Sequence, residues 1–331
     1  MKIGIIGATG AVGRQMLECI EERKISAEEI RLFASERSAG KTIPYKDGVL
    51  TIQTVKEGCF DGLDYVLGAV SNALSKQYRP LIKAAGAVYI DNSSAFRLED
   101  DVPLVVPEIN GEDALKHNGI IANPNCSTII TYMALAGIHK LSPLRKVTAT
   151  TFQAVSGAGI PGLNELTEEI RAIEKGEEVS PSVFPAQIAY NCIAEIGSYT
   201  ENGYTTEEMK MQNEGRKILH DPSLQVTCTC VRVPVYRSHS ISVVFETEDL
   251  LAQEDILQAL KEQEGVVLCE DHVPTPLETS NQDLVYVGRI RKDLTSEKGF
   301  ALWCCGDQIR KGAASNAVDI MEYLEKQNNM I

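Results

Sequence analysis

Short apolar runs alternate with stretches of helical periodicity over the first third of the chain. The apolar runs predict strands at residues 2–6, 30–34, 65–70, 87–91, 104–106 and 119–122. The spacing of apolar residues predicts helices over residues 11–22 and 74–85. Apolar strands that alternate with helices are typical of a parallel, doubly wound sheet, because helices cover both faces of such a sheet. We therefore expect an α/β domain at the start of the chain.

The pattern changes after residue 126. Alternating residues predict strands at residues 146–154, 226–233, 240–247, 266–270, 283–291 and 299–305. Helices are predicted over residues 127–139 and 163–175, and from a capping box at Thr205–Glu208 to about residue 219. This pattern predicts an α+β domain with a mixed or antiparallel sheet, one face of which helices or a partner subunit must cover. A last helix should return to the first domain, so the expected domains are residues 1–125 completed by 312–331, and residues 126–311.

A glycine-rich turn joins the first strand to the first helix. Gly7, Gly10 and Gly13 have the spacing GxxGxxG, which differs from the GxGxxG fingerprint. Gly7 allows a tight turn, Gly10 lets the backbone approach a diphosphate, and Gly13 allows close packing of helix on sheet. Because the turn follows the first strand of a βαβ unit, it predicts a Rossmann-like dinucleotide site, with a purely structural turn as the alternative. The expected cofactor contacts in this turn are Gly7, Thr9, Gly10, Ala11 and Val12.

The end of the second strand favours NADP over NAD. An NAD site usually has Asp or Glu here, to bind the ribose 2′-hydroxyl. In this chain the segment reads Ser35-Glu36-Arg37-Ser38. Arg37 and Ser38 suit a 2′-phosphate through charge-assisted hydrogen bonds, although a solvated basic loop is the alternative. We expect Ser35, Arg37 and Ser38 to bind NADP(H).

Cys126 stands at the end of a polar turn, Asn123-Pro124-Asn125, where a predicted helix begins. A thiol at this point meets the unpaired N–H groups and the positive end of the helix dipole. Both effects favour the thiolate, which is the nucleophilic form of cysteine. The alternative, a small buried apolar residue, is the commoner role for a cysteine. The polar turn makes Cys126 the candidate nucleophile.

His239 is the candidate acid–base residue. The chain has five histidines, and His239 alone lies in a polar Arg-Ser-His-Ser setting at the start of a predicted strand. Histidine is the side chain whose ordinary pKa suits proton transfer near neutral pH. A structural role for this histidine is the alternative.

Composition narrows the function classes. The 331 residues carry a net charge of −14, which argues against a nucleic-acid surface. The nine cysteines are scattered without a disulfide framework, and Cys228 and Cys230 share one side of a predicted strand, which favours core packing over metal binding. No metal site is expected. The chain begins directly with a strand and has no apolar run of membrane-spanning length, so we expect a cytoplasmic protein.

Several motifs occur together along the chain. They lie at residues 7–13, 92–97, 123–127, 151–159, 232–239 and 312–317. With this set, the chain resembles the bacterial type of aspartate-semialdehyde dehydrogenases over essentially its whole length. The resemblance implies reversible, NADPH-dependent reductive dephosphorylation of L-aspartyl-4-phosphate to L-aspartate 4-semialdehyde through a cysteine thioester. It also implies a place in lysine, diaminopimelate, threonine, methionine and isoleucine biosynthesis, and a homodimer joined through the sheet of the second domain.

The resemblance assigns further site residues. It places Gln153 beside Cys126 and makes both of them, with His239, the catalytic set. It implies that the guanidinium of Arg232, which can bind in a bidentate manner, clamps the substrate carboxylate. It implies cofactor contacts at Ser71, Ser156, Gly157, Gln308 and Asn316.

Other residues match positions that bind the charged ends of the substrate. Glu207 matches the position that faces the amino group, and Lys210, on the same helix face, would receive the phosphate together with Arg97. Asn125 is a further expected substrate contact. The alternative for Glu207 and Lys210 is an ordinary surface ion pair.

Two other functions remain open at this point. N-acetyl-glutamyl-phosphate reductase shares the fold and the thioester chemistry, but its cysteine turn reads Asn-Pro-Gly-Cys-Tyr, and its acetylated substrate needs no acidic partner such as Glu207. A non-catalytic dinucleotide-binding regulator would need none of the residues Cys126, Gln153, Arg232 and His239.

Overall fold

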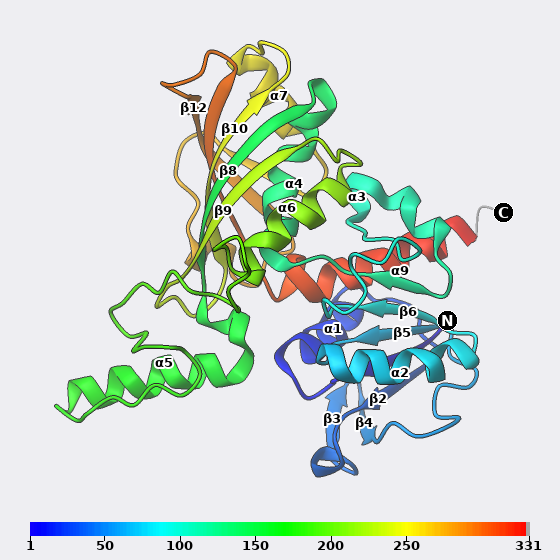
Figure 1. The fold of residues 1–331 in the computed structure, drawn as a ribbon. Coiled ribbons are helices and arrows are strands. Elements are labelled where there is room, and N and C mark those ends of the chain that lie inside the picture. Colours follow the sequence, from blue (N-terminus) through cyan, green and yellow to red (C-terminus); the bar gives the residue numbers. More distant parts are fainter. Residues whose placement is uncertain (329–331) are drawn as a thin grey trace. The chain divides into compact units, whose positions relative to one another are not determined.

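The computed structural model describes residues 1–328, so residues 329–331 of the expected last helix lie outside the described residues. The chain divides into two compact units (Figure 1). Unit 1 consists of residues 1–125 together with the described residues from Ala313 onward. Unit 2 consists of residues 126–312.

Unit 1 contains a seven-stranded sheet. Its strands are β1 (Lys2–Ile6), β2 (Glu29–Phe33), β3 (Thr42–Tyr45), β4 (Gly48–Gln53), β5 (Tyr65–Gly68), β6 (Val88–Asp91) and β7 (Ile120–Ala122). Their order across the sheet is β3-β4-β2-β1-β5-β6-β7, and every pair is parallel except β3 with β4. The strand order reverses at β1, with β2 on one side and β5 on the other, which is where such sheets bind ligands. The predicted doubly wound parallel sheet is confirmed.

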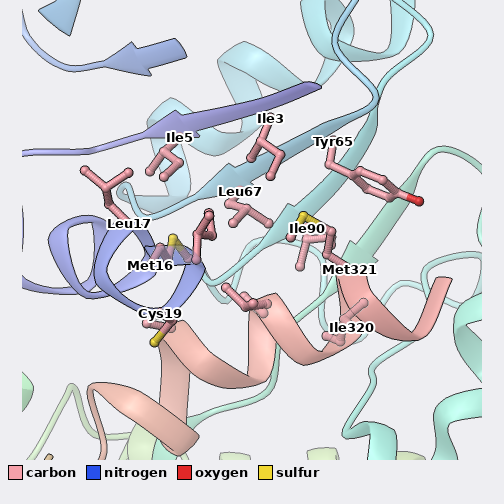
Figure 2. Packing of buried hydrophobic residues seen from close by; sticks show 14 of the residues in the cluster. Ile3, Ile5, Met16, Leu17, Cys19, Tyr65, Leu67, Ile90, Ile320 and Met321 are labelled. Atoms are coloured by element: carbon pink, nitrogen blue, oxygen red, sulfur yellow. The ribbon is translucent and has the colours of Figure 1, made fainter. Parts of the chain in front are cut away.

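The core of unit 1 lies between this sheet and two helices from opposite ends of the chain (Figure 2). The helices of unit 1 are α1 (Ala11–Glu22), α2 (Asn72–Ala84), α3 (Pro107–Asn110) and α9 (Ser315–Asn328), with 3-10 turns η1 (Glu36–Ser38) and η2 (Gly111–Lys116). Ile5 of β1 and Ile90 of β6 belong to the same buried cluster as Met16 of α1 and Met321 of α9. Helix α2 covers the opposite face, since Ser75 Oγ lies 2.8 Å from the hydroxyl of Tyr89, which points away from Ile90.

Two segments of unit 1 differ from the expectation. Residues 42–53 form the β3–β4 hairpin, which the apolar pattern does not show because the first strand has no buried residue and contains Pro44. Residues 104–106, expected as a strand, form only an isolated bridge from Leu104 to Ala122. The side chain of Asn110 takes the place of a strand partner there, since it accepts from Val106 N–H at 2.9 Å and donates to Leu104 O at 2.9 Å.

Unit 2 contains a six-stranded mixed sheet, as predicted. Its strands are β8 (Leu144–Gln153), β9 (Gln225–Arg232), β10 (His239–Thr247), β11 (Val266–Cys269), β12 (Val285–Lys292) and β13 (Gly299–Gly306). Their order is β11-β12-β13-β10-β8-β9. The two outer pairs, β11 with β12 and β8 with β9, are parallel, and the inner pairs are antiparallel.

Three helices cover one face of this sheet (Figure 1). They are α4 (Cys126–Leu141), α6 (Thr206–Ile218) and α7 (Gln253–Glu262). The shorter elements of unit 2 are η3 (Val155–Ala158) and α8 (Pro276–Thr279), and the π-helical turn η4 (Arg310–Ala314) includes the last residues of unit 2 and the first of the segment that returns to unit 1. Thr150, Ser242 and Trp303 are directly paired on three neighbouring strands and are half-buried, so they mark the opposite face. The predicted capping box of α6 is confirmed, because Glu208 N–H donates to Thr205 Oγ1 and Thr205 N–H donates to Glu208 Oε2.

Helix α5 (Gly159–Glu174) lies apart from the three helices that cover the sheet (Figure 1). Leu166 of α5 packs with Phe184 and Ile188 in a small separate core, so the irregular segment that follows α5 folds back on it. The carboxylate of Glu165 accepts hydrogen bonds from the backbone N–H groups of residues 182–184 and holds this segment in place. Within residues 1–328, none of the helices has both the length and the apolar character needed to cross a lipid bilayer.

Candidate active site

Cys126 and His239 form the centre of the candidate site in unit 2. Cys126 is the first residue of α4 and is half-buried. His239 is the first residue of β10, and its side chain is completely buried. Sγ of Cys126 lies 3.4 Å from Nε2 of His239. The fold thus brings together the two residues that the sequence selects as nucleophile and acid–base candidate.

The backbone determines which nitrogen of His239 carries hydrogen. Ala154 N–H donates to Nδ1 of His239 at 3.0 Å, so Nδ1 must hold a lone pair. The hydrogen of the neutral ring is therefore on Nε2, which faces the sulfur of Cys126. Burial, and next the positive charge of Arg232, lower the pKa of His239 to about 3. The ring is neutral at physiological pH and donates its Nε2–H toward the sulfur.

The turn before His239 is held by side chains from other elements. Ser238 has a φ of +74°, a backbone conformation that non-glycine residues rarely adopt. Its N–H donates to Oε1 of Gln308 at 2.8 Å, and its Oγ lies 2.5 Å from Oγ1 of Thr279. Gln308 also donates through Nε2 to Oγ of Ser156, which is buried. Two of the expected cofactor residues, Gln308 and Ser156, are therefore linked to the residue that precedes His239.

Arg232 is buried at the end of β9, directly opposite Gln153 on β8. Its Nη1 donates to Ala154 O at 2.7 Å. Burial lowers the pKa of Arg232, and the carboxylate of Glu207 opposes this shift. A β-carbon at Gly157 would lie 2.7 Å from Nη1 of Arg232, so the guanidinium occupies the space that a side chain at Gly157 would need.

A chain of polar contacts leads from Gln153 to helix α6. Thr151 Oγ1 donates to Oε1 of Gln153 at 3.1 Å, which turns Nε2 of the amide toward Oε1 of Glu207 at 3.3 Å. Lys210 donates to Oε2 of Glu207 at 2.8 Å. The i,i+3 ion pair does form, but its side chains are only 28% and 11% exposed and it continues into Gln153. Thr151 was missed from the sequence, although its place two residues before Gln153 puts both on one face of β8.

The glycine-rich turn of unit 1 has the geometry expected from the sequence. Gly7 has a φ of +81°, and a β-carbon there would collide with Ala69 O. A β-carbon at Gly13 would collide with Gly7 O, so Gly13 does allow close packing of α1. Gly10 is the N-cap residue of α1 and offers no side chain to the first N–H groups of the helix. Contacts of Thr9, Ala11 and Val12 with a cofactor stay predictions.

Other expected cofactor residues lie at the ends of strands or helices in unit 1. Ser35 and Arg37 are exposed, and Ser38, which is half-buried, donates its N–H to Ser35 O at 2.8 Å in the turn after β2. Ser71 is the N-cap of α2 and accepts from Leu74 N–H. The side chain of Asn316 is buried and bonded within unit 1.

The Asn-Pro-Asn turn of unit 1 is held by the buried amide of Asn316. Nδ2 of Asn316 donates to Asn123 Oδ1 at 2.7 Å and to Val105 O at 3.0 Å, and so supports the Asn-Pro-Asn turn. Asn125, in this turn, is buried. Arg97 is also buried and donates through Nη2 to Asn92 O at 2.8 Å. The substrate contacts expected of Asn125 and Arg97 stay predictions.

Comparison with known proteins identifies the family. Residues 2–117 match the family model described as "Semialdehyde dehydrogenase, NAD binding domain", and residues 135–311 match "Semialdehyde dehydrogenase, dimerisation domain". The aspartate-semialdehyde dehydrogenase of Bacillus subtilis is 45% identical over 99% of this chain and 98% of its own length. That of Aquifex aeolicus is 44% identical over 98% of each chain.

Solved structures agree with this match. Aspartate semialdehyde dehydrogenase II of Vibrio cholerae, solved in complex with ASA, superposes with a TM-score of 0.96 at 41% identity, over 98% of both chains. The aspartate-semialdehyde dehydrogenase of Pseudomonas aeruginosa, described as probable, superposes with a TM-score of 0.93 at 26% identity, also over 98% of both chains. The chain therefore belongs to the aspartate-semialdehyde dehydrogenase family.

Proposed function

We propose that this chain catalyses the reversible, NADPH-dependent reductive dephosphorylation of L-aspartyl-4-phosphate to L-aspartate 4-semialdehyde. The reaction would serve lysine, diaminopimelate, threonine, methionine and isoleucine biosynthesis in the cytoplasm. The observation that carries the proposal is the pair formed by Cys126 at the start of α4 and the buried Nε2–H of His239, 3.4 Å from the sulfur.

The first step is acyl transfer to the sulfur. The thiolate of Cys126 attacks the carbonyl carbon of the acyl phosphate, a C–S bond forms, and the C–O bond to phosphate breaks. The Nε2–H of His239 and the N-terminus of α4 stabilise the thiolate before the attack. Covalent catalysis divides one difficult displacement into two easier steps.

The second step is reduction of the thioester. NADPH, when bound, would supply the hydride for the thioester carbon. The resulting oxyanion collapses, the C–S bond breaks, and the aldehyde leaves while Cys126 returns to its thiolate form. The proton consumed overall ends on the released phosphate, so the cycle does not require His239 to change its charge. The geometry favours a hydrogen-bond donor role for His239 over the proton-transfer role expected from the sequence, because Nδ1 already accepts from Ala154 N–H.

Substrate recognition follows from charges in unit 2. The guanidinium of Arg232 is proposed to bind the substrate carboxylate, with Nη1 also held by Ala154 O. Glu207 is proposed to bind the ammonium group, and its neighbour Lys210 the phosphate. Because Glu207 contacts Gln153 within the same polar chain, an acidic group is in place for a free amino group. This contact supports aspartyl phosphate over an N-acetylated substrate.

Unit 1 is proposed to bind NADP(H). Residues of the glycine turn fit a diphosphate, since α1 begins without a side-chain cap and Gly10 has no side chain. Arg37 and Ser38, in the turn after β2, would hold the 2′-phosphate. The match to an NAD-binding domain supports a dinucleotide, and the preference for NADP rests on the residue types in this turn.

We also propose a homodimer joined through the uncovered face of the unit 2 sheet. Helices α4, α6 and α7 lie on the other face, while the half-buried side chains of Thr150 and Ser242 lie on this one, beside Trp303, which is bonded to the loop before α8. The match of residues 135–311 to a dimerisation domain supports this assignment. A second copy would remove this partly apolar face from water.

One assay tests the proposed reaction. Reduction of NADP⁺ by the purified chain is followed with L-aspartate 4-semialdehyde, with and without inorganic phosphate. The matched control replaces the substrate with the N-acetylated glutamate semialdehyde. Phosphate-dependent reduction with the aspartate compound is the expected result. Activity with the acetylated compound alone, or with neither compound, would contradict the proposal.

A further inference from the structure

A second group of potential ligand atoms lies beside the edge strand β11 of the unit 2 sheet, outside the candidate active site. It consists of Cys269 at the end of β11, His272 in the loop that follows, and Glu278 in α8, and we call it the Cys269 cluster. One ligand atom from each residue lies within 4.8 Å of the other two. A thiol, an imidazole and a carboxylate that face one another are the donor set of a mixed-ligand metal site.

Each side chain of the Cys269 cluster is held from outside the cluster. Cys269 is buried and is paired with Gly288 in the parallel β11–β12 ladder. Glu278 is the third residue of α8, and its Oε2 accepts Thr275 N–H at 3.4 Å in a capping contact. That contact leaves Oε1 of Glu278 directed at Nε2 of His272, 2.8 Å away. The carboxylate therefore presents Oε1 to the ring nitrogen in a fixed direction.

The imidazole of His272 is oriented in the way that metal-bound histidines usually are. Its Nδ1 lies 2.7 Å from Oδ1 of Asp271, and its Nε2 faces Glu278. In metal sites the ring nitrogen that does not bind the ion commonly donates to a carboxylate, which fixes the tautomer and strengthens the other nitrogen as a ligand. The side chain of His272 is 46% exposed, so the imidazole is open to solvent.

The loop between β11 and α8 is anchored to the sheet. The indole N–H of Trp303 donates to Pro274 O at 2.9 Å, and Sγ of Cys305 lies 3.2 Å from the same oxygen. A β-carbon at Gly288 would lie 2.9 Å from Cδ of Pro274, so the loop packs onto the strand where a side chain is missing. Tetrahedral zinc geometry puts its N and O ligands about 3.3 Å apart. Nε2 of His272 and Oε1 of Glu278 are 2.8 Å apart, so these two atoms need only a small shift to accept an ion.

We propose that the Cys269 cluster binds a borderline divalent cation of the zinc class. The ligands are Sγ of Cys269, Nε2 of His272 and Oε1 of Glu278, with water in the fourth position. On binding, the thiol loses its proton and the ring loses the proton on Nε2, and both protons pass to solvent. Thiolate and imidazole ligands favour zinc over magnesium or calcium, which prefer oxygen. The chain, expected from its sequence to hold no metal, thus has a candidate metal site with one position open to water.

The competing state is an ion-free one. Asp271 and Glu278, which hydrogen-bond to the two ring nitrogens, raise the pKa of His272 and stabilise a protonated ring between two carboxylates. In that state the proton on Nε2 occupies the place of the cation. In the ion-bound state the thiolate of Cys269 binds the metal, and in the ion-free state no such bond exists. Absorption spectroscopy detects a metal–thiolate bond directly.

Cobalt titration of the full-length chain tests the proposal. Co²⁺ takes zinc-type sites and shows an intense near-ultraviolet charge-transfer absorption when a thiolate binds it. The titration uses a Cys126→Ala background, because the thiol of the candidate active site also lies beside a histidine. We expect one equivalent of Co²⁺ to produce the thiolate band, and Zn²⁺ to displace it.

Variants in the same background identify the ligands. Cys269→Ala should abolish the thiolate band, and His272→Ala should weaken Co²⁺ binding at least about 100-fold. Asp271→Asn, which leaves the ligands in place, should weaken it by about 10–100-fold. Cys192→Ala removes an exposed cysteine elsewhere in unit 2 and is the matched control, which should keep the band. Absence of a thiolate band in the Cys126→Ala chain, or a band that survives both Cys269→Ala and His272→Ala, would overturn the proposal.

Discussion

Gly312 lies against Cys126: a β-carbon at Gly312 would come within 2.7 Å of the β-carbon of Cys126. The two residues are far apart in the sequence but belong to the same compact unit. The place of the candidate nucleophile therefore depends on the absence of a side chain at the end of unit 2.

Gly312→Ala should lower turnover by displacing Cys126. The new methyl group has no space, so the start of α4 must shift, and misplacement of a reacting atom by about 1 Å can cost up to about 100-fold in rate. We expect kcat to fall by about 10- to 100-fold while NADPH affinity changes little. Gly48→Ala is the control, because a β-carbon at Gly48 meets no atom within 4 Å. Equal activity of Gly312→Ala and Gly48→Ala would show that Cys126 tolerates displacement.

Cys126→Ala should abolish turnover because no other group can form the thioester. NADPH binding, measured by fluorescence, should stay near the wild-type value, since the proposed cofactor residues of the glycine turn are intact. Cys192→Ala, which removes an exposed thiol, should leave turnover unchanged. Turnover by the Cys126→Ala chain would rule out covalent catalysis at this residue.

The buried His239 should make the folded chain less stable in acid. Its pKa is about 3 in the folded chain, compared with an ordinary value of 6.5. Between these values the unfolded chain binds one proton more than the folded chain, so the free energy of unfolding falls as the pH drops through this window. Above pH 6.5 both states hold a neutral ring and this contribution is constant.

Urea unfolding of wild type and His239→Asn at a series of pH values measures this contribution. The variant lacks the titrating group, so its free energy of unfolding should fall less steeply between about pH 6.5 and pH 4. Identical slopes for the two proteins would contradict a depressed pKa for His239.

Arg37→Ala should weaken NADPH binding more than NADH binding. A charge-assisted hydrogen bond to the 2′-phosphate is worth about 1.5–3 kcal/mol, which corresponds to about a 10- to 100-fold change in the NADPH dissociation constant. NADH lacks that phosphate and should be affected little. Lys46→Ala, which removes a charge elsewhere in unit 1, serves as the control. The same loss for both cofactors would remove Arg37 from the 2′-phosphate site.

Thr150→Arg should separate the proposed homodimer. Thr150 is half-buried on the uncovered sheet face, where a second copy would have to bury the new charge. Light scattering should report a monomer for this variant and a dimer for wild type. Gln258→Arg places the same charge on the exposed side of α7 and should remain dimeric. A dimeric Thr150→Arg chain would exclude this face as the interface.

Local features of this chain were determined by its sequence. The glycine turn before α1 and the capping box of α6 depend on residues a few positions apart, whose backbone preferences act without help from the rest of the fold. The same is true of Cys126, because a polar turn followed by a helical pattern places it at a helix start wherever that helix packs. Apolar periodicity predicted the doubly wound sheet for a related reason, because a buried strand consists of apolar residues that are visible in its own sequence.

Elements without a clear apolar pattern were not predicted from the sequence. The exposed hairpin of β3 and β4 buries few side chains, so its residues carry little periodic signal. The Cys269 cluster was not predicted from the sequence either, because its cysteine, histidine and glutamate face one another only after β11 and α8 have folded around the loop between them.

Tertiary structure alone decided the chemistry inside the site. The parallel pairing of β8 with β9 sets Gln153 opposite Arg232, and Gly157 then provides the space that the guanidinium fills. Ala154 N–H, not any property of the histidine itself, selects the nitrogen of His239 that faces the sulfur. These contacts join residues that are distant along the chain, and their geometry follows from strand register and burial, which no short stretch of sequence specifies.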